Sequence, residues 1–185
     1  RPEEIAVLYR NNKDAFPVAE ALERAGVKYG IESDEDLFNE KYVRKFLTLL
    51  EAIALYGNDE KLIEALHIEE LGIEPLDVYK LINESYKKKI FVYDLISKNP
   101  TYKKLSRLLE DWVRNSKTEY LTEFLERVLR QSGILYSMIK EQNAESFFGI
   151  EKLFAEAKRI TSNRSGAILS DFMGYLNIIK NYKIF

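Results

Sequence analysis

Residues 3–31 read EEIAVLYRNNKDAFPVAEALERAGVKYGI, and this stretch combines two kinds of hydrophobic pattern. The run Ile5–Tyr9 is short and apolar, as in a strand that is buried on both faces. Apolar residues then recur at helical spacing from Lys13 to Ala25, and Gly26 can adopt the left-handed conformation that ends a helix. Val27–Ile31 has a second strand pattern. The stretch therefore predicts a β-α-β unit of an α/β domain.

The first predicted strand ends in Tyr9 and Arg10, at the position where α/β domains bind ligands. Ligands of open parallel sheets collect outside the carboxyl ends of the strands. An aromatic ring placed there can stack on a base, and an arginine can meet a phosphate because it stays charged. The spacing alone also fits an ordinary surface charge that pairs with a nearby acid.

The rest of the chain carries helical patterns. A linker with five acids and no base, residues 32–40, leads to an apolar stripe between Val43 and Ala54 that Asn39 can cap and Gly57 can close. We expect this helix to be the spine of a helical domain of about eight helices, so that the fold is mostly α. The other predicted helices span residues 59–67, 75–87, 92–97, 101–115, 118–132, 134–140, 145–160 and 169–182.

The composition is that of a globular chain with few metal ligands. Of 185 residues, 46% are hydrophobic and 12% aromatic, which is enough to build a core. There is no cysteine and a single histidine, His67, so no metal site is expected. No apolar run approaches about 18 residues, and the opening RPEE is neither a signal peptide nor an initiator methionine. We expect a cytoplasmic segment of a longer protein, with no membrane partner.

The net charge is −2, but the basic residues are unevenly distributed. The segment Tyr86–Arg107, called here the basic band, holds seven bases against one acid, Asp94. Such a band is either a solvated surface or a contact for nucleic-acid phosphates. Its aromatic rings could pack inward or lie along a DNA backbone. The bases are Lys87, Lys88, Lys89, Lys98, Lys103, Lys104 and Arg107, and the rings are Tyr86, Phe91, Tyr93 and Tyr102.

The segments IAVLYRNN, AEALERAG and VKYGI, in this order, resemble the opening of the second RecA-like motor domain of UvrD/Rep/PcrA-type superfamily 1 DNA helicases. DLFNEKYVRKFLTLLEAIAL resembles the loop and long helix that follow in that family. Three later motifs resemble parts of the inserted helical accessory domain, called 2B: LGIEPLDVYKLI, LTEFLERVLRQSGILYSMI and LSDFMGYLNII. The resemblance implies a motor-domain edge at residues 1–35 and an accessory domain at residues 36–185.

The resemblance also implies a share in an ATP site. In the family, the tyrosine and arginine that close this strand contact the adenine and the γ-phosphate, and Tyr9 and Arg10 occupy those positions, which makes Arg10 a catalytic residue. ATP and Mg²⁺ are the cofactors implied for the full-length protein. The chain contains no GxxxxGK[ST] phosphate loop. We therefore expect this segment alone to bind neither cofactor and to hydrolyse no ATP.

Gly72 and Ile73 match the family's Gly-Ile-Gly turn, which presents backbone amides to duplex phosphates. The second glycine of that turn is Glu74 here, and its carboxylate would repel a phosphate. The plainer interpretation of this segment is a loop before a helix that begins at Pro75. The partners implied are DNA at a junction of single strand and duplex, and the remaining helicase domains of the same chain. The predicted DNA-binding residues are Gly72 and Ile73, which the resemblance implies, and Lys87, Lys88, Lys89, Lys103 and Lys104, which the charge of the basic band suggests.

Two other interpretations remain open from the sequence. The chain could be a helical protein-interaction module without an enzymatic role, in which the β-α-β start is only scaffold. It could also be the equivalent region of a RecB- or AddA-like helicase that carries a nuclease domain.

Overall fold

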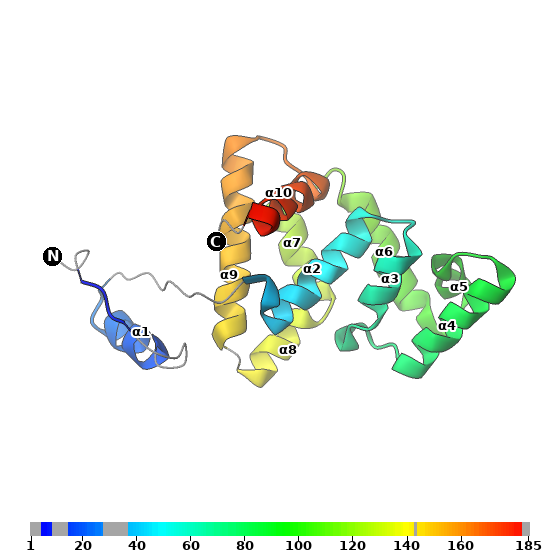
Figure 1. Ribbon diagram of the computed structural model, residues 1–185, viewed down its shortest axis with the longest axis horizontal. Coiled ribbons are helices and arrows are strands. Elements are labelled where there is room, and N and C mark those ends of the chain that lie inside the picture. The colour runs from blue at the N-terminus through cyan, green and yellow to red at the C-terminus, as the bar shows by residue number, and fades with distance from the viewer. Residues whose placement is uncertain (1–4, 9–14, 28–36, 143, 183–185) are drawn as a thin grey trace. The chain divides into compact units, whose positions relative to one another are not determined.

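The computed structural model describes residues 5–8, 15–27, 37–142 and 144–182 (Figure 1). The chain divides into two compact units, Arg1–Glu35 and Asp36–Phe185, and each is described by itself. The assignment of these units to a motor-domain edge and an accessory domain stays a prediction.

The first unit contains helix α1 (Ala15–Arg24), which confirms the helix predicted between the two strands. The helix ends as the sequence predicts, because Gly26 takes a left-handed φ of +66° and the Val27 N–H donates to the Leu22 carbonyl at 2.9 Å. The predicted strands are not confirmed. Residues 5–8 have no regular secondary structure, and Leu8 is 95% exposed. A strand needs a hydrogen-bonded neighbour, and the described residues provide none. The rest of both strands lies outside the described residues.

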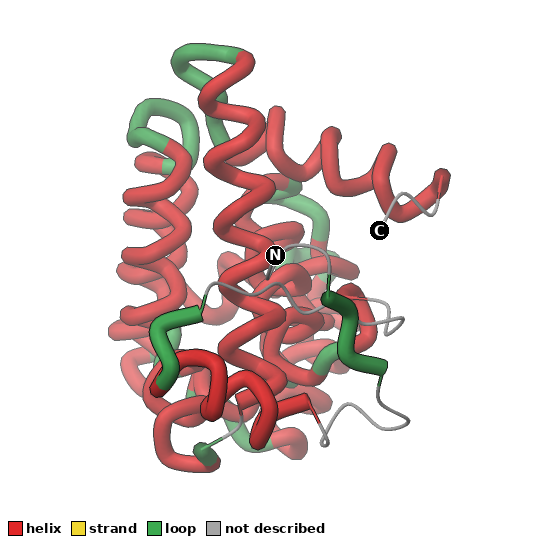
Figure 2. Tube along the Cα trace, turned by 90° about the vertical axis from the view of Figure 1, so that its left-hand side faces the viewer, coloured by secondary structure: helices red, strands yellow, loops and turns green. Residues whose placement is uncertain are grey.

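The second unit is helical, and its described residues contain no strand (Figure 2). The 3-10 segment η3 (Leu37–Asn39) precedes its first helix, and two others, η4 (Glu69–Leu71) and η5 (Pro100–Tyr102), lie between its helices. The helices described in this unit are α2 (Lys41–Ala54), α3 (Asp59–Leu66), α4 (Pro75–Lys88), α5 (Val92–Lys98), α6 (Lys103–Asn115), α7 (Leu121–Gln131), α8 (Ile134–Glu141), α9 (Ala144–Asn163) and α10 (Leu169–Tyr182). The prediction of a mostly α fold is confirmed.

Helix α2 is the spine of this unit, as the sequence predicts. It contacts α3, α6, α8, α9 and α10, and Figure 1 shows it crossing the middle of the bundle. Seven of its residues are buried, among them Tyr42, Phe46 and Leu50, which are fully enclosed. Burying side chains of this size contributes about 1.5–3 kcal/mol each relative to leaving them in water. None of the described helices is both long enough and apolar enough to cross a membrane.

The cap of α2 differs from the prediction. Glu40, not Asn39, is the N-cap residue, and its Oε2 accepts the Val43 N–H at 2.7 Å. The longer side chain serves better here because its second oxygen, Oε1, also accepts a hydrogen bond from the Ser146 hydroxyl on α9. A short asparagine side chain can cap its own helix only.

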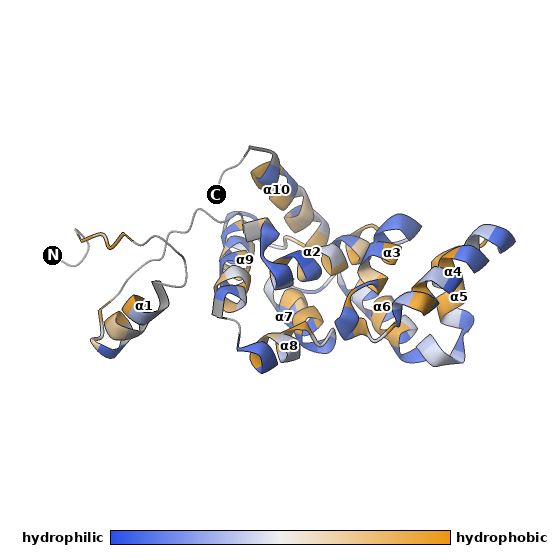
Figure 3. Cartoon of the chain, turned by 60° about the horizontal axis from the view of Figure 1, so that its bottom comes forward, coloured by the Kyte–Doolittle hydropathy of each residue, from blue (hydrophilic) through white to orange (hydrophobic). Residues whose placement is uncertain are grey.

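Helices α4, α5 and α6 form the part of the unit that carries the basic band. Asp59, at the start of α3, accepts the Val92 N–H at 3.1 Å and so caps α5 from another helix. The Ser85 hydroxyl donates to the Ile90 carbonyl at 2.7 Å and fixes the turn between α4 and α5. Figure 3 colours the lysine-rich end of α4 as hydrophilic, which agrees with its position in solvent.

Candidate nucleic-acid interface

Helix α4 provides the first group of basic side chains. Pro75 begins it at a position where a missing N–H breaks no helical bond, and Lys89 ends it in a left-handed conformation with φ +53°. Lys87 and Lys88 lie in the last turn, where the helix dipole favours positive charge. These two lysines therefore stabilise the helix itself, independently of any ligand.

All three lysines at this end, Lys87, Lys88 and Lys89, are exposed. Lys88 forms an ion pair with Glu84 at 2.5 Å, one turn earlier on the same helix. Lys87 and Lys89 form no ion pair with any described residue. Two cations are thus available to an external anion at the end of α4.

Lys103 and Lys104 lie in a second place. They open α6, and the residue before them, Tyr102, donates its hydroxyl to Asp77 Oδ2 at 3.0 Å, near the start of α4. Asp77 and Lys87 are separated by ten residues, or about 15 Å along the axis of α4. The basic band is therefore divided into two patches, one at each end of α4.

The second patch is unfavourable for its own helix. The first turn of α6 contains no acidic residue, and the two lysines there face the positive end of the helix dipole. Both side chains are exposed, and neither forms an ion pair with a described residue. A helix that places two lysines where they cost stability has the charge distribution expected of an anion-binding surface.

The rings of the basic band have two different environments. Tyr93 and Tyr102 are half-buried and are held through their hydroxyls, Tyr93 by Glu110 at 2.8 Å and Tyr102 by Asp77. Burial, together with hydrogen bonds to Tyr56 and Glu110, raises the pKa of Tyr93 far above its usual value, so its hydroxyl stays protonated. Tyr86 is 86% exposed and Phe91 61% exposed. Only the last two rings are free to meet a ligand.

The Gly72–Ile73 turn is less open than the family motif implies. Gly72 is exposed with φ +73°, but its N–H already donates to the Glu69 carbonyl at 3.0 Å. The Ile73 side chain is buried in the hydrophobic core. Glu74 is exposed beside the turn, so a carboxylate faces the solvent there. Within this turn, only the surface of Gly72 is available for close approach of another molecule.

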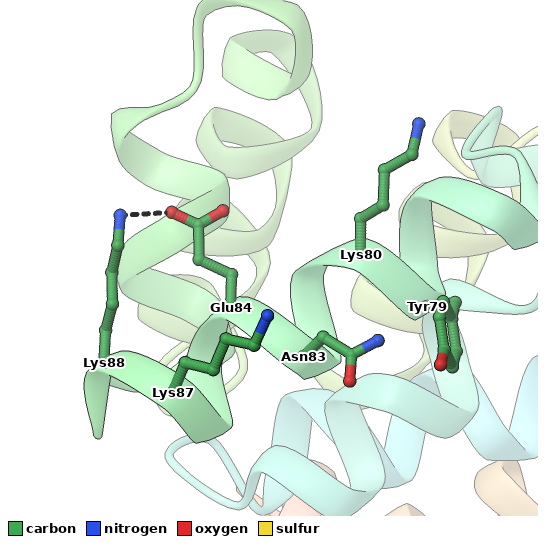
Figure 4. A pocket seen from close by; sticks show the side chains of 6 residues that line it. All are labelled: Tyr79, Lys80, Asn83, Glu84, Lys87 and Lys88. Carbon is green, nitrogen blue, oxygen red and sulfur yellow. Dashed lines mark hydrogen bonds and ion pairs between the residues drawn. The ribbon is translucent and has the colours of Figure 1, made fainter.

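A hollow of about 520 Å³ lies along the outer face of α4 (Figure 4). Figure 4 shows the side chains around it standing out from one helix, with the Lys88–Glu84 ion pair at one end and Tyr79 at the other. Tyr79 and Lys80 lie outside the basic band, and the sequence marks them only by their spacing of seven residues from Tyr86 and Lys87. The lining residues are Tyr79, Lys80, Asn83, Glu84, Lys87 and Lys88.

The predicted nucleotide contacts, Tyr9 and Arg10, lie outside the described residues. Among the residues that are described, no group of three or more His, Cys, Asp or Glu side chains could hold a metal ion. His67 ends α3, and its Nδ1 donates to the Ile63 carbonyl at 2.8 Å, which is a structural role at a helix end.

The sequence matches known proteins along almost its whole length. The model of the family "UvrD-like helicase C-terminal domain" matches residues 1–183. An ATP-dependent DNA helicase PcrA of Staphylococcus epidermidis is 23% identical over 160 residues, which cover 81% of this chain and 22% of that protein. The PcrA helicase of Staphylococcus aureus is 22% identical over 161 residues, covering 82% of this chain and 22% of the relative. The chain thus spans about a fifth of the length of these curated relatives.

Proposed function

This chain belongs to the family of UvrD-like helicase C-terminal domains, whose model matches residues 1–183, and we propose that it is part of an ATP-dependent DNA helicase. The observation that carries this proposal is the extent of the match, which includes both the α1 unit and the helical unit. The PcrA relatives, named as ATP-dependent DNA helicases, support the same activity for the whole protein.

The first part of the proposal concerns ATP. Tyr9 and Arg10 match the tyrosine and arginine that contact the nucleotide in the resembling family. An arginine suits this role because its guanidinium stays charged and can stabilise negative charge on a phosphoryl group that is being transferred. This sequence contains no GxxxxGK[ST] phosphate loop. We therefore assign ATP and Mg²⁺ to the complete protein and not to this segment alone.

The second part assigns the helical unit to DNA as an accessory domain. Its support is the exposure of Lys87, Lys89, Lys103 and Lys104 at the two ends of α4, without ion pairs to described residues. Lysines arranged in this way bind phosphates, and phosphate contacts carry no sequence information. The accessory domain would then hold the duplex in position, while the motor domains of the helicase act on the strand.

Charge reversal at the end of α4 tests the DNA contact. The triple substitution Lys87→Glu, Lys88→Glu and Lys89→Glu should weaken binding of a DNA duplex by the 185-residue chain. Each phosphate contact adds about 0.9 to the slope of log affinity against log salt concentration, so the slope should fall by about two to three units. Titration of a labelled duplex at several salt concentrations measures this slope.

A matched control separates the location of the charge from its amount. Lys140, Lys152 and Lys158 are exposed on α8 and α9, and none forms an ion pair with a described residue. Their triple substitution by Glu changes the net charge equally and should leave the slope near its original value. An equal fall of the slope in both triple variants, or an unchanged slope in the α4 variant, would contradict the assignment of the contact to α4. Fluorescence of the buried Trp112 checks that each variant is folded.

A further inference from the structure

The outer face of α4 carries the same pair of residues twice. Tyr79–Lys80 and Tyr86–Lys87 are seven residues apart, which is two helical turns, so the two pairs point to the same side of the helix. They are separated by about 10.5 Å along the axis. Tyr79 is 63% exposed and Tyr86 is 86% exposed, so both rings are open to solvent on this face.

The hollow along this face is lined by residues of both pairs, Tyr79, Lys80 and Lys87. Asn83 lies midway and lines the hollow, where its amide offers both donors and an acceptor (Figure 4). The acids near the hollow are already neutralised, because Glu84 pairs with Lys88 at 2.5 Å and Asp77 pairs with Lys80 at 2.8 Å. Lys87 is left without an ion-pair partner among the described residues. The face therefore combines two open rings, one amide and one available cation.

These features select an unpaired strand over a duplex. In a duplex the bases are stacked on one another, so a side-chain ring cannot reach their flat faces, and lysines alone would suffice to hold the backbone. In a single strand the base faces are open, and proteins bind such strands with aromatic rings set beside basic side chains. An acidic protein segment would satisfy Lys87, but it provides no flat partner for two rings.

We propose that the outer face of α4, formed by Tyr79, Lys80, Asn83, Tyr86 and Lys87, binds unpaired DNA. The two tyrosine rings stack on bases, and the Lys87 side chain, which has no ion-pair partner among the described residues, contacts the backbone. Binding of this kind is tolerant of sequence, because every base has a flat face. This inference rests on the proposed function, since it takes DNA to be the ligand of the chain, and it adds a single-strand contact to the duplex contact proposed above.

The test removes the rings and keeps the charges. The double variant Tyr79→Leu and Tyr86→Leu retains apolar side chains but has no flat π-face, and the probes are a labelled thymidine oligonucleotide and a duplex of equal length. Base stacking on an aromatic side chain is strong enough that losing two rings should weaken single-strand binding at least about tenfold. Affinity for the duplex should stay unchanged. Tyr79→Phe with Tyr86→Phe restores the rings and should restore single-strand binding.

A matched control uses two tyrosines elsewhere on the surface. Tyr120 and Tyr136 are 72% and 71% exposed, at the start of α7 and on α8, and their joint substitution by Leu should change neither affinity. Unchanged single-strand binding by the α4 double variant would overturn the inference. The inference would also be overturned if the α4 double variant lost binding to poly-glutamate, used as a model of an acidic protein segment, while its DNA binding stayed intact. That result would assign the face to an acidic protein segment. A chain that binds duplex but no single strand refutes this inference alone, whereas a chain that binds neither refutes its proposed DNA contacts as well.

Discussion

The carboxylate of Glu40 joins two helices by bonding to Ser146, which lies 106 positions later in the sequence. One oxygen caps α2 through the Val43 N–H, and the other accepts the hydroxyl of Ser146, which is fully buried on α9. Removing a cap of this kind typically costs about 1 kcal/mol, and a buried hydroxyl that loses its acceptor costs about 1–3 kcal/mol more. A single side chain therefore fixes both the start of the spine helix and the position of α9 against it.

Arg10 is the residue on which the catalytic part of the proposal depends. In the full-length helicase, Arg10→Ala should lower ATP turnover by about 10²- to 10³-fold, because one donor to the developing charge on the γ-phosphate is lost. DNA affinity should change little. Steady-state ATP hydrolysis, measured beside DNA binding, separates the two effects.

Arg10→Lys is the matched control for this prediction. It keeps the charge but loses the planar guanidinium, so its turnover should lie between that of the wild type and that of the alanine variant. Wild-type turnover in Arg10→Ala would remove Arg10 from the catalytic machinery. A parallel loss of DNA binding would indicate that the substitution disturbs the fold.

For the helices, the sequence predicts which ones form better than it predicts where each begins and how it is capped. Helix α10 spans Leu169–Tyr182 as its apolar pattern predicts. The residues of a core-facing stripe recur at helical spacing, so they can be recognised from the local sequence alone. The start of α6 moves from residue 101 to Lys103, because Pro100–Tyr102 form a 3-10 turn whose geometry the hydrophobic pattern does not encode. The cap that Asp59 provides for α5 spans 33 residues, so no local pattern could predict it.

The candidate interface shows the same limit. The sequence identifies the lysines of the basic band, because charge runs are visible in one dimension. It presents them as one patch, whereas the path of the chain through α4, α5 and η5 places Lys87 and Lys103 at opposite ends of a helix. Which rings pack inward depends on partners such as Glu110, and those become known only with the fold.

Gly149 lies where α9 packs closely against α2. A Cβ added there would lie 2.7 Å from Val43 Cγ2, and Val43 is a fully buried, β-branched residue that cannot move aside. Gly149→Ala gains up to about 1 kcal/mol in helix propensity, but overpacking of this kind costs about 1–3 kcal/mol. We expect a net destabilisation of up to about 2 kcal/mol in chemical denaturation.

Gly174 provides the matched control for this helix contact. It lies in α10, and a Cβ added there would meet nothing within 4 Å. Gly174→Ala should therefore stabilise the protein by up to about 1 kcal/mol through propensity alone. If both variants were stabilised equally, the close contact between α9 and α2 would not exist as described.

At the scale of the whole molecule, the two units differ in how they cover apolar surface. The helical unit encloses a continuous core from Phe38 to Ile179. In the first unit, Ile5 and Leu8 are 72% and 95% exposed among the described residues. A two-stranded sheet is marginal in isolation, and the chain spans only 22% of its PcrA relatives. We propose that strands from the remaining motor domain cover this apolar surface in the complete helicase.

The acid stability of the helical unit is governed by carboxylates that are paired in the fold. Burial alone would raise the pKa of Asp111, but its ion pairs with Arg127, at 2.6 Å, and Arg114 outweigh burial and hold that pKa below the usual 3.8. Lys80 and Tyr102 lower the pKa of Asp77 in the same direction. In both cases the unfolded chain takes up a proton at higher pH than the folded chain. The stability from these pairs is therefore complete above about pH 5 and is lost as the pH falls through 3.8 and below.

Trp112 makes this loss measurable, because it is the only tryptophan and is fully buried beside Asp111, with its Nε1 donating to Gln131 at 2.7 Å. The urea midpoint followed by its fluorescence should be constant between about pH 7 and 5 and should fall steeply below about pH 4. Asp111→Asn should lower the midpoint at neutral pH and flatten the acid slope, because the variant has no carboxylate to protonate at this position. Arg127 keeps Glu119 as a partner, so this variant should still fold. An acid slope in Asp111→Asn as steep as in the wild type would show that the Asp111–Arg127 pair does not contribute to stability.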